Sequence, residues 1–222
     1  MPRGPRLPAP GSTIHVVARC NNRQFLLQDA ADFERILRLL AVMRSSYGVT
    51  VYAYTLMSNH VHLLLQAPQG IRLGRPLRWF LTETAKAYHR THERRGHFWE
   101  HRYRAVVVED DLYALAALRY LDRNPVRARI VDDPTTYPWS SCAAYALGQA
   151  DPLITYHPTF LGLSRYPKVR CRKYREMVTT ITDPALEQRD PQWTELPVVG
   201  SPEFVGRFAL KGGLKSLRPP LS

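Results

Sequence analysis

The spacing of apolar and polar positions changes along the chain, and each change predicts a new element. Residues 12–20 are rich in β-branched side chains, which is typical of a strand. Across residues 29–47 the apolar positions recur at helical spacing, and Gly48 follows as a stop signal. The pattern therefore predicts a strand and then an amphipathic helix.

Two strand-like runs come next, over residues 49–57 and 60–67, with Ser58 and Asn59 between them. So short a connection predicts a tight hairpin. Beyond it the pattern predicts a helix that ends at Gly96, a strand, a turn and a third helix, over residues 75–95, 101–108, 109–111 and 112–123.

The order strand, helix, strand, strand, helix, strand is the split-βαβ pattern of a ferredoxin-like fold. We expect an α+β domain over residues 13–145, with an antiparallel sheet, helices on one face and one additional helix at its end. Prolines and glycines make residues 1–12 a flexible basic leader. Residues 146–222 are punctuated by prolines and predict a basic C-terminal extension, for which DNA binding is one candidate role.

Charge narrows the class of partner. The chain carries 31 Lys and Arg against 19 Asp and Glu, a net charge of +12, which is typical of a protein that binds a phosphate backbone. A membrane surface is the alternative, but no apolar run approaches the roughly 18 residues of a spanning helix. Without the apolar core of a signal peptide at the start, we expect a cytoplasmic protein with no membrane partner.

The cysteines do not indicate a disulfide framework or a cysteine-rich zinc site. Cys20, Cys142 and Cys171 are odd in number, widely spaced and outside any CxxC pair. We expect three free thiols.

His60 and His62 form a His-x-His triplet at the start of a predicted strand. Strand side chains alternate between faces, so both imidazoles should project to the same side. Imidazole suits several transition metals and tolerates Mg²⁺ when oxygen ligands complete the shell. The alternative is two ordinary strand histidines. The three leucines that follow, Leu63 to Leu65, favour a buried strand whose polar start lies at a rim or cleft.

Tyr120 and Asn124 are the second candidate pair. Positions four residues apart on a helix stand one above the other, and Pro125 should end this helix and leave Asn124 in its last turn. A phenol beside a metal that orients a phosphate could act as a nucleophile. The alternative is a half-buried tyrosine followed by an asparagine cap.

Together these motifs resemble those of a known family. Residues 55–65 (TLMSNHVHLLL), 120–128 (YLDRNPVRA) and 137–141 (YPWSS) strongly resemble the REP-associated tyrosine transposases, members of the single-tyrosine HUH transposase group. Residues 19–24 (RCNNRQ) also look like theirs. The resemblance runs from about residue 14 to residue 144, in order and at plausible spacing.

The resemblance implies a single-stranded DNA endonuclease and strand transferase that forms a 5′-phosphotyrosine intermediate, acting on hairpin-forming repeat DNA. His60 and His62 would hold Mg²⁺ or Mn²⁺, Tyr120 would be the nucleophile, and Asn124 would be the third protein ligand. The resemblance favours a monomer, and a dimer stays open.

Basic and polar residues at the ends of predicted elements are the candidate DNA contacts: Arg19, Asn22, Arg23, Arg102, Tyr103, Arg104 and Arg127. Phe98, Trp99 and Tyr103 interleave with these charges, and aromatic faces can stack unpaired bases. The alternative is solvated arginines and core aromatics.

A second group of histidines, His89, His92, His97 and His101, could form a zinc site, although no cysteine or carboxylate spacing supports one.

Two other functions compete with the transposase interpretation. A domesticated relative could bind DNA or RNA hairpins without catalysis. A metal hydrolase or a two-histidine phosphodiesterase would need a second HxT/S motif or an HxHxDH extension, but Leu63 and Leu64 follow His62.

Overall fold

The computed structural model describes residues 11–110, 112–180 and 190–212. The first ten residues of the predicted leader, Asp111 of the predicted turn and the last ten residues of the extension lie outside these ranges.

The first half of the chain forms the predicted elements in the predicted order. These are β1 (Thr13–Arg19), α1 (Ala30–Tyr47), β2 (Thr50–Met57), β3 (His60–Gln66), α2 (Gly74–Thr91) and β4 (Arg104–Val108). Gly48 follows α1 in the left-handed conformation, with φ at 63°, which glycine adopts without steric cost. The predicted stop signal is therefore confirmed.

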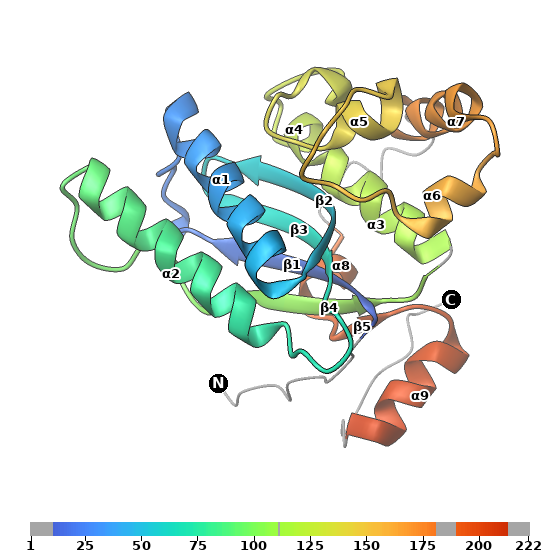
Figure 1. The fold of residues 1–222 in the computed structure, drawn as a ribbon, viewed down its shortest axis with the longest axis horizontal. Coiled ribbons are helices and arrows are strands. Elements are labelled where there is room, and N and C mark those ends of the chain that lie inside the picture. Colours follow the sequence, from blue (N-terminus) through green and yellow to red (C-terminus); the bar gives the residue numbers. More distant parts are fainter. Residues whose placement is uncertain (1–10, 111, 181–189, 213–222) are drawn as a thin grey trace.

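The strands form one sheet in the order β2-β3-β1-β4-β5 (Figure 1). The first three pairings are antiparallel, and they reproduce the ferredoxin-like arrangement that the sequence predicts. The fifth strand, β5 (Val198–Val199), runs parallel to β4 and makes the sheet mixed. The extension thus returns to the sheet and covers the edge of β4.

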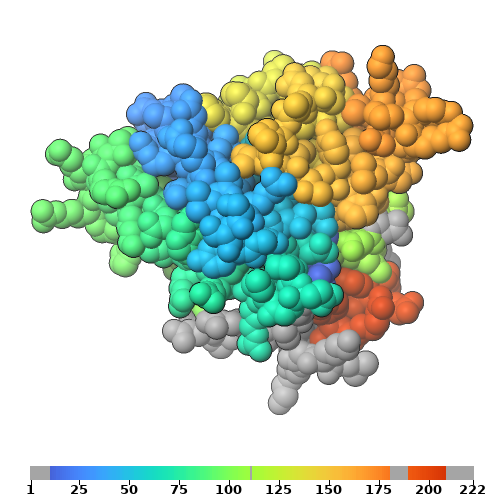
Figure 2. Space-filling model, in the orientation of Figure 1, coloured from blue at the N-terminus to red at the C-terminus, as the bar shows by residue number. Residues whose placement is uncertain are grey.

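One face of the sheet is covered by α1 and α2, as predicted (Figure 1). The core between them is apolar and combines Val16, Ala18, Val61, Leu63 and Leu65 of the strands with Phe33, Ile36, Leu40, Leu77 and Phe80 of the helices. In the space-filling view, side chains of α1 and α2 form much of the visible surface over the sheet (Figure 2).

The other face is covered by α3 (Leu112–Asp122), which contacts β2, β3 and β4. Three further helices, α5 (Cys142–Leu147), α6 (Pro158–Gly162) and α7 (Pro167–Thr179), gather on the same side as α3 (Figure 1). The expected boundary between residues 145 and 146 falls inside α5, whose buried Tyr145 packs against α6 and α7.

Short elements complete the described chain: η1 (Asn21–Arg23), α4 (Asn124–Arg127), η2 (Pro134–Thr136), α8 (Gln192–Glu195) and α9 (Pro202–Gly212). The cysteines are free, as expected.

Two predicted boundaries differ from the structure by three residues or more. The second helix ends at Thr91 and not at residue 95, because Glu93 takes a left-handed conformation, with φ at 47°, that a continuing helix does not allow. The fourth strand begins at Arg104 and not at residue 101. The residues just before it lie outside the ladder that β4 forms with β1.

Candidate functional site

His60 and His62 begin β3, one of the inner strands of the sheet. Val61 between them points into the apolar core under α1 and α2, so the two histidines face α3, as strand alternation requires. Their ring centroids lie 4.8 Å apart. His62 is buried and His60 is half-buried.

Tyr120 reaches this pair from α3. Its ring centroid lies 5.8 Å from that of His62. The buried residues Leu118 and Leu121 anchor the helix, and the hydroxyl of Thr55 on β2 donates to the backbone carbonyl of Leu121 at 3.1 Å. Packing and this hydrogen bond therefore hold the phenol beside the histidines.

Asn124 does not lie in the last turn of the tyrosine helix, and this part of the prediction is wrong. The helix ends at Asp122, and Asn124 opens α4 with Pro125 in its first turn. Proline suits that position because its missing N–H has no helical partner there.

The side chain of Asn124 nevertheless turns back toward the candidate site. Its amide nitrogen donates to the carbonyl of Tyr120 at 2.9 Å and to that of Leu121 at 3.3 Å. Its side chain also lies close enough to His60 to raise the pKa of that ring. The carboxamide is thus fixed between the end of α3 and the first histidine.

The two imidazoles are held in the neutral form. The pKa of His60 is lowered to about 3, first by burial and then by the nearby guanidiniums of Arg19 and Arg127, while the side chain of Asn124 opposes the shift. The pKa of His62 is well below its ordinary value because of burial and then the neighbouring charges. Neutral imidazole is the form that binds a metal ion.

His15 belongs to this group, and the sequence analysis missed it. It lies on β1, beside β3, and its Nε2 is 2.9 Å from Nδ1 of His62. The two rings stack with centroids 5.2 Å apart, and burial lowers the pKa of His15 to about 3. A lone histidine in a predicted strand gives little signal, because only the register between β1 and β3 brings it to His62.

Arg127 and Trp193 enclose the phenol further. The guanidinium of Arg127 lies over the Tyr120 ring, 4.3 Å from its centroid, and donates to the Tyr120 carbonyl. The Trp193 ring is 5.9 Å from the phenol ring, and Tyr120 is 8% exposed. Trp193 lies far along the chain in the extension, and no motif in the sequence indicated this contact.

Several predicted DNA contacts gather at the end of the sheet near His60. Arg19 is the direct β1 partner of His60, and the exposed residues Asn22 and Arg23 follow it in η1. Backbone contacts join Cys20 to Trp99 in an isolated bridge next to them.

Residues 102–104 take different positions. Arg102 is exposed, whereas Tyr103 is half-buried with its hydroxyl near Gly74 at the start of α2. Arg104 is exposed and donates to the backbone carbonyl of Thr194 in α8.

Phe98 and Trp99 differ in whether a DNA base could stack on them. Phe98 is 2% exposed and belongs to the core under α2, so it has no face for a base. Trp99 is half-buried, with its indole N–H donating to the carbonyl of Leu81. The alternative of core aromatics therefore holds for Phe98.

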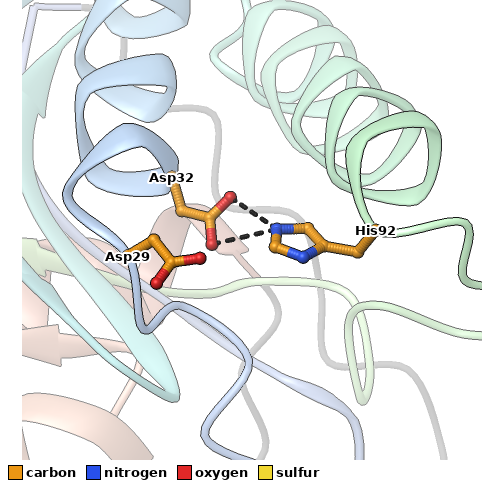
Figure 3. Close-up of side chains that lie close together, drawn as sticks. All are labelled: Asp29, Asp32 and His92. Carbon is orange, nitrogen blue, oxygen red and sulfur yellow. Dashed lines mark hydrogen bonds and ion pairs between the residues drawn. The ribbon is translucent and has the colours of Figure 1, made fainter.

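The second histidine group does not assemble. His92 pairs with Asp32 at 2.9 Å, and Asp29 lies close by (Figure 3). Among the described residues, these three form the one group of at least three histidine, cysteine or acidic side chains that is close enough to hold a metal. Arg35 also pairs with Asp32 at 3.0 Å. Arg35 and His92 thus already bond to this carboxylate.

The family of the chain follows from comparison of its sequence. The family described as "Transposase IS200 like" matches residues 10–124, which is more than half of the chain. The chain belongs to this family. The match spans both histidines of β3, Tyr120 and Asn124, and it ends before the extension.

The first of two similar solved structures shares the fold. A REP-associated tyrosine transposase bound to a REP hairpin is 16% identical, with a TM-score of 0.57 over 72% of this chain and 93% of that one. A candidate transposase from Deinococcus radiodurans is 21% identical, with a TM-score of 0.39 over 59% of this chain and 92% of the other. No curated protein matches significantly.

Within the described residues, no helix combines the length and the apolar character that a bilayer crossing requires.

Proposed function

We propose that this protein is a metal-dependent single-stranded DNA endonuclease and strand transferase with Tyr120 as its nucleophile. The observation that carries the proposal is the packing of the Tyr120 ring 5.8 Å from His62, on the same sheet face as His60. Membership of the IS200-like transposase family supports it.

The chemistry of the donor set fits Mg²⁺ or Mn²⁺. His60 and His62 offer neutral ring nitrogens, and Asn124 offers a carboxamide oxygen beside His60. Such mixed nitrogen and oxygen ligands suit Mn²⁺ and, with further oxygen ligands, Mg²⁺. When bound, the ion would neutralise charge on the scissile phosphate.

The residues of the chain supply the nucleophile and its surroundings. The Tyr120 oxygen attacks the phosphorus in line, the new bond forms as the bond to the 3′ oxygen breaks, and the phenol loses its proton while the 3′ oxygen gains one. The phosphodiester energy is retained in the 5′-phosphotyrosine, so a 3′-hydroxyl can later attack it and rejoin a strand.

Arg19 and Arg127 lie close enough to both histidines to depress their pKa. Two guanidiniums there would hold the phosphate oxygens, because Arg matches their geometry with paired donors. The neighbouring residues Asn22, Arg23, Arg102 and Tyr103 would extend this surface along the strand. We propose a monomer in which Tyr120 acts within its own chain, with a dimer as the alternative.

The substrate we propose is single-stranded DNA with a hairpin. The fold relative of 16% identity was solved with a REP hairpin, and a net charge of +12 favours a polyanionic partner. Residues 146–222 would then act as a DNA-binding extension through α7, whose exposed side chains include Lys168, Arg172, Lys173 and Arg175.

The test is formation of a covalent adduct. Incubation with labelled hairpin-bearing single strands and Mn²⁺, followed by denaturing gels, should give a protein–DNA band that Tyr120→Phe abolishes. Tyr113→Phe, on the same helix and half-buried, is the matched control and should keep the band. Binding without any adduct would instead support the non-catalytic hairpin-binding function.

A further inference from the structure

His62 contacts a second histidine, His15, on the neighbouring strand β1. That contact makes His15 a candidate for positioning His62. His15 is fully buried on β1, and its Nε2 lies 2.9 Å from Nδ1 of His62. Between two neutral imidazoles at this distance, one nitrogen must carry the hydrogen and the other must accept it.

Two arrangements of this hydrogen are consistent with the distance. If His15 donates, His62 accepts on Nδ1 and carries its own hydrogen on Nε2, where no lone pair is left for a metal. If His62 donates from Nδ1, its Nε2 keeps a lone pair. Only the second arrangement leaves His62 able to bind a metal ion, as the proposed function requires.

The backbone of Trp193 lies near the His15 ring and raises the pKa of that ring, the direction expected of a carbonyl beside a ring N–H. Nδ1 of His15 is nevertheless buried without a hydrogen-bond partner among the described residues. The contact between Nε2 of His15 and Nδ1 of His62 is therefore the observation that carries the second arrangement.

We propose that His15 is a positioning residue whose Nε2 receives a hydrogen bond from Nδ1–H of His62. This hydrogen bond fixes the tautomer of His62 with Nε2 free for a metal ion. In metal-binding histidines, the ring nitrogen that does not bind the metal commonly donates a hydrogen bond that fixes the tautomer. Here the acceptor of that bond is another histidine.

The inference also gives the extension a part in the site. Trp193 lies outside residues 10–124, the family match, yet its backbone meets His15 and its ring packs 5.9 Å from that of Tyr120. The pairing of β5 with β4 and the hydrogen bond from Arg104 to Thr194 hold this segment against the sheet.

The inference rests on the proposed role of His62 as a metal ligand, but its first test needs neither metal nor DNA. Long-range ¹H–¹⁵N spectra of the metal-free full chain separate protonated from unprotonated ring nitrogens. His62→Gln and His15→Gln variants assign the signals. We expect both rings to be protonated on Nδ1. Protonation of His62 on Nε2 would overturn the proposal, even if no His15 variant folds.

The second test is Mn²⁺ binding to the same chain by calorimetry. His15→Leu removes both nitrogens and should weaken binding about 10- to 100-fold, as loss of such a partner commonly does. His15→Gln retains an acceptor and should keep most of the affinity. His92→Gln, in the Asp29 and Asp32 group, should change nothing at this site. Wild-type affinity in His15→Leu would refute the role of His15.

The proposed function can fail separately. Loss of the tyrosine-dependent adduct, with the His62 tautomer as expected, would contradict catalysis and leave the positioning of His62 intact. An adduct that forms normally in His15→Leu, with Mn²⁺ affinity unchanged, would retain the endonuclease and remove His15 from its mechanism.

Discussion

Leu63 and His62 are neighbours on β3, but they belong to opposite faces of the same sheet. Leu63 packs in the core under α1 and α2, where the buried strand residues of β1 and β3 are apolar. His62 lies under α3, where its neighbours include His15 and Tyr120. The alternation of a strand thus separates, by one residue, an apolar face from the face under α3, here called the polar face because it carries these groups beside a second apolar core.

The polar face is buried as deeply as the apolar one. Thr13, His15 and Thr55 are 0% exposed. Such groups are costly unless they find partners, and they do so across long stretches of sequence: Thr13 donates to Asp110 at 2.6 Å, and Thr55 donates to the carbonyl of Leu121. The comparison teaches that the apolar face serves packing alone, whereas the polar face combines apolar packing, such as that of Leu64 and Leu118, with polar groups that need partners.

The largest effect should come from the first histidine of the polar face. His60→Gln should lower DNA cleavage by about 10⁴-fold, the size typical when one member of a set of groups acting together is removed. Its unfolding midpoint in urea should stay close to that of the wild type, because His60 is half-buried at the strand start. Timed cleavage of a hairpin substrate measures the loss. Cleavage at the wild-type rate would contradict the assignment of a catalytic face.

The adjacent apolar face should show the opposite pattern. Leu63→Ala should lower the free energy of unfolding by about 2–5 kcal/mol, the range for a buried leucine that leaves a cavity. Mn²⁺ affinity, measured where the variant is still folded, should change little. Urea titration and calorimetry give the two values. An equal loss of Mn²⁺ affinity in this variant would mean that the faces are not independent.

Addition of metal should stabilise the fold through the polar face. Free Mn²⁺ at about 100 times its dissociation constant should add about 2.7 kcal/mol to the free energy of unfolding. His62→Gln should lose this gain, whereas His92→Gln should keep it. Thermal or urea unfolding with and without Mn²⁺ provides the comparison. A gain that disappears only in His92→Gln would place the ion at Asp29 and Asp32.

The smallest effect should come from α7, which lies on the same side of the sheet as α3 (Figure 1). If α7 contacts DNA, Lys168→Gln with Arg172→Gln should make the slope of log affinity against log salt less negative by about 0.7 per lost single-strand contact. Lys86→Gln with Arg90→Gln on α2, over the apolar face, is the matched control and should leave the slope unchanged. Fluorescence anisotropy over a salt series measures both. Equal slopes in all three proteins would remove α7 from the DNA interface.

Local signals in the sequence determined most of the core fold. Helical spacing, the stop at Gly48 and the two-residue link at Ser58 and Asn59 act within a few residues, so α1, β2 and β3 could be predicted without knowledge of tertiary contacts. The alternation on β3 placed His60 and His62 on one side for the same reason. The end of the tyrosine helix was misjudged, because Pro125 can start a new turn as well as stop an old one.

Tertiary structure alone decided what surrounds those local motifs. His15 meets His62 through the register of β1 on β3, and Trp193 meets Tyr120 because β5 joins the edge of β4. The sequence therefore determined the strand with its histidine pair and the helix with its tyrosine. The partners that enclose them depend on pairings between distant segments, which no short-range pattern encodes.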